Sequence, residues 1–136
     1  MVESLWSIPT ANDVRAPLTI MKEQATALTE QTKGSLVGWV ETTAYGDGDL
    51  AISLSIQAPS LNNYKYRLMT YIQPITMYPG RLASGVPKAS GANVYVPPQS
   101  IKVEDEGEFL AALKRLLSSD EVKHLLSSLL LQANTA

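Results

Sequence analysis

The chain has 136 residues, of which 45% are hydrophobic and 18% charged, and its formal net charge at pH 7 is −2. This length predicts one domain, residues 1–136, that can bury about 68% of its unfolded surface without a metal or a disulfide. The absence of cysteine excludes disulfide frameworks and thiolate metal or redox sites. Because the N-terminus does not resemble a signal peptide and no apolar run approaches the roughly 20 residues that cross a bilayer, we expect a cytoplasmic protein without a membrane partner.

The N-terminal part predicts an irregular arm, residues 1–16, followed by one helix. Trp6 and Ile8 are the expected anchors of the arm onto the body of the domain. The helix is expected to begin at Pro17, because proline fits the first turn, where its missing N–H leaves no hydrogen bond unmade. Gly34 predicts its end, since glycine accepts the left-handed conformation of a helix cap. The apolar residues between them recur at helical spacing: Leu18, Met21, Ala25 and Leu28.

After this helix the hydrophobic period changes to two, which predicts three strands, at 35–44, 50–58 and 62–73. Residues 45–49, "YGDGD", read as the turn between the first two strands. Pro74 ends the third strand, because proline has no N–H to donate to a neighbouring strand. The links are short, so we expect an antiparallel meander.

Strict alternation along the third strand predicts which side chains point to the core and which point away. Tyr64 and Tyr66 are expected on the core face, together with the apolar side chains of the second strand. The opposite face combines cationic, aromatic and sulfur-containing residues, types enriched at protein interfaces. The alternative is that the arm or the C-terminal helices cover this face. The predicted partner-binding residues are Trp39, Lys65, Arg67, Met69 and Tyr71.

Residues 79–100 contain four prolines and three glycines, which predicts a long loop with a short edge strand at 93–96. A further short strand is expected at 101–103. Long loops in compact domains are often functional, so an alternative is a binder of a small acidic ligand, or an enzyme, with its site under this loop. The candidate ligand contacts there are Arg81, Lys88 and Tyr95.

The C-terminal region predicts two helices, because Asp105 and Ser118 are each followed three residues later by a glutamate, the pattern of a helix N-terminus. In one straight helix the two leucine arcs would point in opposite directions, so we expect a break near Ser118. The alternative is one long helix with its second arc turned to a partner. The candidate oligomer-interface residues on this arc are Leu126, Leu129 and Leu130.

No motif supports catalysis, a cofactor or a metal site. The aspartates of 46–50, "GDGDL", lack the further ligands of a calcium loop, and 80–85, "GRLASG", lacks the Lys-Ser/Thr pair of a phosphate loop. His124 has no second histidine or cysteine beside it with which to hold zinc. The acidic residues of 104–108 precede a helix, where the helix dipole favours negative charge.

Together these patterns predict an α+β fold: an antiparallel sheet of three to five strands with an N-terminal helix and two C-terminal helices packed on it. The expected function is a non-enzymatic protein–protein interaction module, a homodimer or a binder of another protein, comparable to a small acidic chaperone or an immunity-type inhibitor. Nucleic-acid binding through Lys65, Arg67, Arg81 and Lys88 is disfavoured by the acidic balance of the chain.

Overall fold

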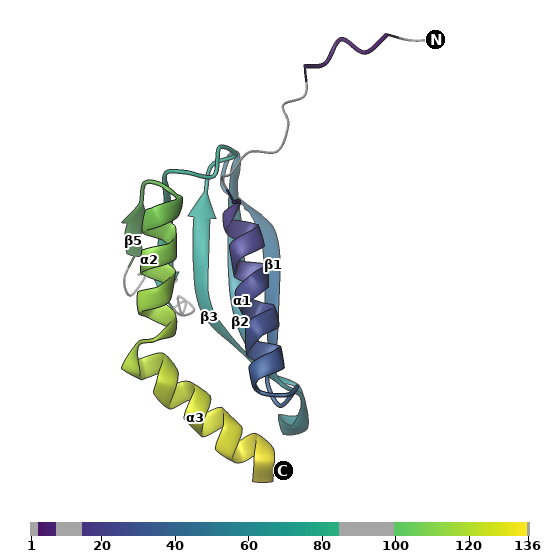
Figure 1. Cartoon of the computed structure of the whole chain (residues 1–136), viewed down its shortest axis with the longest axis vertical. Helices are drawn as coiled ribbons and strands as arrows, with labels where there is room; N and C mark the ends of the chain where they lie inside the picture. The colour runs from purple at the N-terminus through teal and green to yellow at the C-terminus, as the bar shows by residue number, and fades with distance from the viewer. Residues whose placement is uncertain (1–2, 8–14, 85–99, 136) are drawn as a thin grey trace.

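The computed structural model describes residues 3–7, 15–84 and 100–135, and it confirms the predicted α+β arrangement (Figure 1). Within these residues, three α-helices accompany one five-stranded antiparallel sheet. In chain order the elements are α1 (Pro17–Gln31), β1 (Val37–Tyr45), β2 (Asp49–Ala58), the 3-10 helix η1 (Pro59–Leu61), β3 (Tyr64–Gln73), β4 (Gly80–Ser84), β5 (Ser100–Val103), α2 (Glu106–Leu117) and α3 (Asp120–Thr135).

The sheet is a meander in which each strand pairs with its neighbours in sequence, in the order β1-β2-β3-β4-β5. Gly46 and Gly48 in the β1–β2 hairpin have φ of 57° and 91°, a conformation that glycine adopts without strain. β4 corrects the prediction that residues 79–100 form one loop, because 81–84 pair with β3. The predicted edge strand at 93–96 lies outside the described residues.

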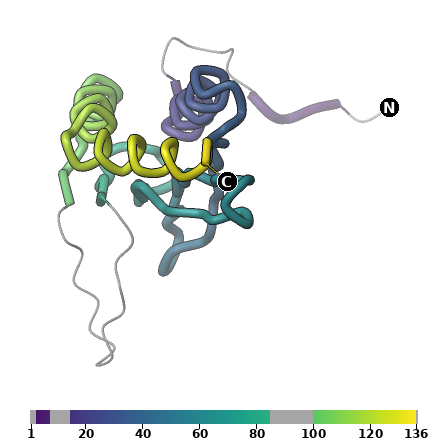
Figure 2. Tube along the Cα trace, turned by 90° about the horizontal axis from the view of Figure 1, so that it is seen from below, coloured from purple at the N-terminus to yellow at the C-terminus, as the bar shows by residue number. Residues whose placement is uncertain are grey.

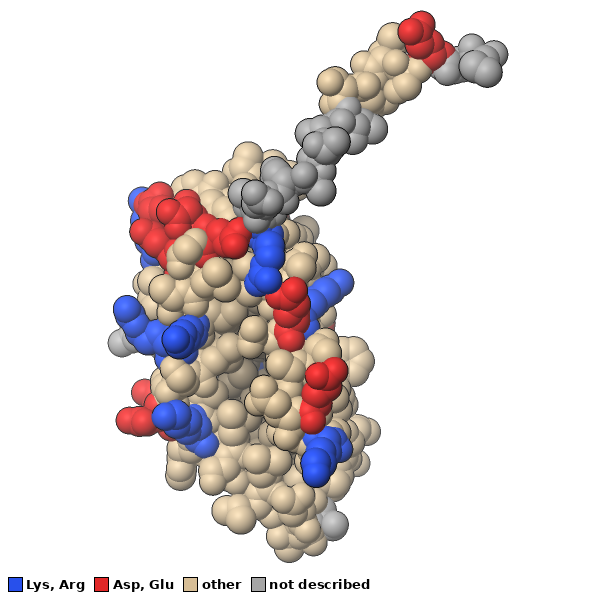
Figure 3. Space-filling view, viewed as in Figure 1, with Lys and Arg blue, Asp and Glu red and all other residues tan. Residues whose placement is uncertain are grey.

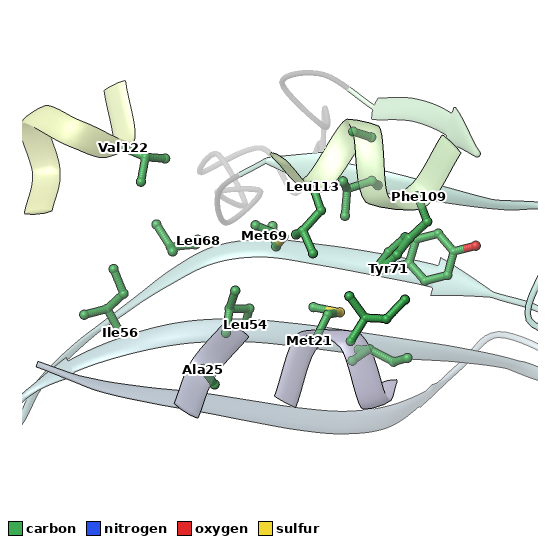
Figure 4. Close-up of a cluster of buried hydrophobic side chains, with 14 of the residues drawn as sticks. Met21, Ala25, Leu54, Ile56, Leu68, Met69, Tyr71, Phe109, Leu113 and Val122 are labelled. Atoms are coloured by element: carbon green, nitrogen blue, oxygen red, sulfur yellow. The ribbon is translucent and has the colours of Figure 1, made fainter. Parts of the chain in front are cut away.

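All three helices lie on one side of the sheet, as the view along the strands shows (Figure 2). α1 covers β1 and β2, while α2 lies over β4 and β5. The core fills the space between the two layers (Figure 4). Its fully buried side chains come from α1, from the sheet and from α2, and the largest are Tyr71, Phe109, Ile20, Met21, Leu36, Ile52, Ile56 and Met69.

α1 lies unusually close to β1, and Gly38 makes this approach possible. A Cβ atom at Gly38 would lie 2.5 Å from both the Cα atom and the carbonyl oxygen of Ala25. The Gly38 N–H also donates to the Thr29 hydroxyl at 3.0 Å. A side chain at position 38 would therefore push the helix away from the sheet.

The C-terminal region is broken into two helices, as the capping patterns predicted. Asp105 caps α2, because its carboxylate accepts the Glu108 N–H at 2.9 Å. α2 ends at Leu117, and the first turn of α3 is capped by Ser119, whose hydroxyl accepts the Val122 N–H at 3.3 Å. The predicted cap, Ser118, instead ends α2: its hydroxyl donates to a carbonyl oxygen of that helix. This break redirects the second leucine arc toward the core.

Candidate functional site

The candidate site is the sheet face opposite the helices, which we call the open face. A β-bulge in β3 decides which residues reach it. Leu54 of β2 pairs with Met69, but the next residue, Ser55, pairs with Arg67, so Leu68 has no opposite residue. Two consecutive residues, Leu68 and Met69, therefore point to the helix side (Figure 4).

The bulge overturns part of the predicted partner-binding face. Met69 pairs with Leu54 and Tyr71 with Ile52, which places both side chains in the core, where they are 0% exposed. The prediction that they share a face with Arg67 is wrong, because strict alternation fails at the inserted residue. Before the bulge the assignment is correct: Arg67 lies opposite Ser55 on the open face.

The register places the other predicted residues on the open face as well. Trp39 pairs with Ser55, and Lys65 pairs with Gln57. Beyond the bulge, Arg81 pairs with Ile72 and with Lys102. The open-face cations are Lys65, Arg67, Arg81 and Lys102. The carboxylates are Glu41 and Asp49 in its strands and Glu104, which pairs with Lys102 at 3.1 Å, so the formal charge is +1.

Trp39 is the most prominent aromatic side chain of this face, and polar contacts hold it in place. Its indole N–H donates to the Gln57 side-chain oxygen, and the Lys65 ammonium lies 5.2 Å from its ring centroid. Lys65 also pairs with Glu41, and this hydrogen-bonded ion pair holds the pKa of the Glu41 carboxyl below its usual value. Trp39 remains 43% exposed, so part of this positioned ring faces solvent.

A shallow hollow of about 260 Å³ lies beside this cluster. Small side chains form its floor, among them Ala51, Ser53 and Ala83, while Tyr45 and Arg67 contribute to its wall. Sites for small molecules usually measure about 300–1,000 Å³. The hollow is therefore better suited to one inserted side chain than to a whole ligand.

The other predicted site residues are not brought together. Lys88 and Tyr95, the proposed companions of Arg81, lie outside the described residues, as does Ile8 of the arm. Trp6, the other expected anchor, does not pack on the body, because it is 84% exposed.

One of the predicted oligomer-interface residues, Leu129, is corrected, and the other two stay a prediction. Leu129 is only 5% exposed, and Leu126 and Leu130 pack against the core of their own chain. The reason is the break at Ser118–Ser119, which lets α3 turn its leucine arc inward.

The described residues show no arrangement suited to metal binding. Among residues 3–7, 15–84 and 100–135, no group of three or more His, Cys, Asp or Glu side chains is placed to hold a metal ion. His124 is exposed on α3, and the open-face hydroxyls of Ser53 and Thr70 lie 3.1 Å apart as a hydrogen-bonded pair. No helix in this part of the chain has the length and hydrophobicity of a membrane span.

A buried aromatic cluster was not predicted from the sequence. The Tyr71 ring packs edge-on against Phe109 at 4.8 Å, and its hydroxyl donates to the Met77 carbonyl at 2.8 Å. The Tyr78 hydroxyl is buried without a partner, and burial together with the nearby Glu106 raises its pKa to about 12. Both phenols therefore stay protonated at neutral pH, which suits a structural role.

Three open-face residues were also missed by the sequence analysis: Tyr45, Gln57 and Ile72. Counting alternate positions from Trp39 reaches Tyr45, and counting from Ser53 reaches Gln57, whereas Ile72 reaches the open face only because of the bulge. No protein-family model, no curated protein and no solved structure matches the chain.

Proposed function

We propose that this protein is a non-enzymatic interaction module that binds another protein, one with an acidic surface, through the open face of its sheet. The observation that carries the proposal is the combination found on this face: an exposed, positioned Trp39 among cations. The described helices all pack on the opposite side of the sheet.

The charge of the face favours a different protein over a second copy of this chain. Stacking two such faces would bring a formal charge of +1 against +1. Like charges across an interface are unfavourable and exclude wrong partners. An acidic partner would instead find complementary charges, although the chain as a whole is itself acidic.

The size of the face fits a modest protein interface. Its strands contain 9, 10, 10, 5 and 4 residues, which at ~3.3 Å per residue and ~4.8 Å between strands cover roughly 600 Å². Specific complexes bury about 800 Å² on each partner, so the face supplies most of such an area.

Trp39 is the expected binding hot spot. Tryptophan and arginine dominate the binding energy of many interfaces. Trp39 on the edge strand β1 and Arg67 on β3 both pair with Ser55 of β2. Gln57 and Lys65 hold the indole in place before binding, which reduces the entropy lost on association. The neighbouring hollow can accept one side chain of the partner.

Photo-crosslinking tests this proposal. A photoreactive amino acid in place of Trp39 should capture a discrete acidic protein in the native host, and the same residue in place of exposed Lys22 on α1 is the matched control. The charge reversal Arg67→Glu should abolish the captured band. Equal capture from positions 39 and 22, or capture that survives Arg67→Glu, would contradict an interface on the open face.

Single-stranded nucleic acid is a second candidate ligand, favoured by one observation. The structure places Lys65, Arg67 and Arg81 on the same face as Trp39, and single strands bind by stacking bases on aromatic rings along a basic surface. This mode predicts a gel shift of an RNA oligonucleotide that weakens with salt and disappears in Trp39→Ala. A shift that Trp39→Ala leaves unchanged would reject it.

A further inference from the structure

The helix layer contains an apolar groove between α1 and the two C-terminal helices. One hollow of about 150 Å³ lies over Leu54 and Leu68 of the sheet. A second, of about 400 Å³, lies between α1 and α2. Gln24 and Leu117 line both hollows, so the two are continuous, and we call them together the helix groove.

Half of the residues that line the helix groove are leucines. In the space-filling view, a band of uncharged residues separates the charged side chains of α1 from those of α2 (Figure 3). Leu110 at the α2 wall is 39% exposed, while Leu28 and Leu126 are partly buried. Lys114 is the one charged residue that lines either hollow in the described part of the chain.

The same chain carries a segment that matches this groove. Residues 3–7 lie away from the body of the domain (Figure 1), and two large apolar side chains on them face water. Leu5 is 94% exposed and Trp6 84%. Adjacent exposed hydrophobic side chains of this size are characteristic of segments that dock on a partner. Glu3, the charged residue beside them, can meet Lys114 at the groove.

We propose that residues 3–7 of one copy dock into the helix groove of a second copy, with Leu5 and Trp6 as the apolar anchors. In a two-fold dimer each copy contributes one arm and one groove, so both sets of exposed apolar residues become buried and the assembly closes. This contact leaves the open face available, so it is independent of the proposed function.

The exposure of Leu5 and Trp6 favours a second copy over the groove of the same chain. Eight residues lie between Trp6 and Arg15, and nine residue steps reach ~30 Å when extended, so the length of the arm excludes neither groove. In the structure, however, Leu5 and Trp6 make no buried contact with their own domain. Docking in the second copy must depend on protein concentration, whereas folding back cannot.

Tryptophan fluorescence separates these two arrangements. The chain has two tryptophans, so Trp39→Phe leaves Trp6 as the only one. The Trp6 emission should shift to shorter wavelength as concentration rises, in parallel with a change from monomer to dimer mass in sedimentation. A blue shift that does not depend on concentration, or a monomer throughout, overturns the proposal.

Two variants locate the contact. Trp6→Ala in the arm and Leu110→Lys in the groove should each weaken dimerisation about tenfold or more. Leu131→Lys, at a 69% exposed position that does not line the groove, is the control and should leave it unchanged. If Leu110→Lys does not fold by circular dichroism, Gln24→Lys on the opposite wall replaces it.

Mixing the two variants provides the decisive test. The Trp6→Ala copy keeps an intact groove and the Leu110→Lys copy keeps an intact arm, so together they retain one arm–groove contact. A heterodimer should form although neither variant dimerises with itself. Dimers that persist in both single variants would show that another surface mediates association and would overturn the proposal.

Discussion

Replacing Leu129 by alanine measures how far α3 turns its leucines toward the core. Leu129 is 5% exposed, whereas Leu131, two residues along the same helix, is 69% exposed. The substitution removes three carbon atoms at ~0.8 kcal/mol each, or about 2.4 kcal/mol for a buried leucine. This value lies at the low end of the ~2–5 kcal/mol range for core leucines, as expected because Leu129 borders an open hollow.

For Leu131→Ala the same calculation, reduced to the buried fraction of the side chain, gives about 0.7 kcal/mol. The two variants should therefore differ by about 1.7 kcal/mol in the free energy of unfolding, measured from urea denaturation midpoints at equal m-values. An equal or larger loss for Leu131→Ala would refute the inward orientation. So would a Leu129→Ala protein of unchanged stability but altered mass in solution, because that residue would then face a partner.

Three further predictions concern the packing of the sheet and the aromatic cluster. Gly38→Ala should lower the free energy of unfolding by about 1–3 kcal/mol, because its Cβ atom would lie 2.5 Å from the Ala25 backbone. Gly107→Ala, whose Cβ atom meets nothing closer than 3.5 Å, should raise the free energy of unfolding by about 0.5–1 kcal/mol. A loss of stability in both variants would remove the steric explanation. Tyr71→Phe should lower the free energy of unfolding, measured by urea denaturation, by about 1 kcal/mol, because the hydroxyl donates a buried hydrogen bond. Tyr78→Phe should be neutral or stabilising, because its buried hydroxyl has no hydrogen-bond partner among the described residues. The reverse order would contradict the assigned contacts. The pKa of Tyr78 in the folded state is raised from 10.0 to about 12, so its contribution to stability is complete below pH 10 and is lost as pH rises toward 12. Tyr78→Phe should therefore flatten the alkaline fall in stability, followed by circular dichroism. An unchanged slope would show that another group causes the fall.

Local signals predicted the element boundaries well. The expected helix start at Pro17 is where α1 begins, and Gly34 follows its end with a φ of 83°. The break near Ser118 was likewise predicted from the side chains of two neighbouring turns. These features depend on the conformational preferences of a few adjacent residues, and such preferences can be predicted from the residue types alone.

The features that the sequence did not predict depend on pairing between distant residues. No local pattern from Arg67 to Met69 predicts a bulge at Leu68, because the extra residue is defined only by the pairing of β3 with β2. β4 was hidden for a similar reason: its five residues are flanked by proline and glycine, and only pairing with β3 makes them a strand. The face of every residue beyond the bulge follows from these pairings.

The candidate site was therefore predicted in part. Trp39, Lys65 and Arg67 lie on the open face as alternation required, since they precede the bulge or belong to another strand. Met69 and Tyr71 follow it and belong to the core. The placement of Arg81 beside Lys102 joins two strands separated by residues 85–99, a contact that no local pattern encodes.

The meander has a consequence for how the chain folds. Every strand pair joins neighbours in sequence, so most of the sheet can form through short-range closures, which favour rapid folding. The exception is the last pair, because the segment 85–99 separates β4 from β5, whereas only the segment 46–48 separates β1 from β2. Closing a fivefold longer segment costs about 1.4 kcal/mol more in chain entropy, so addition of β5, and with it α2, is expected to be the late event in folding.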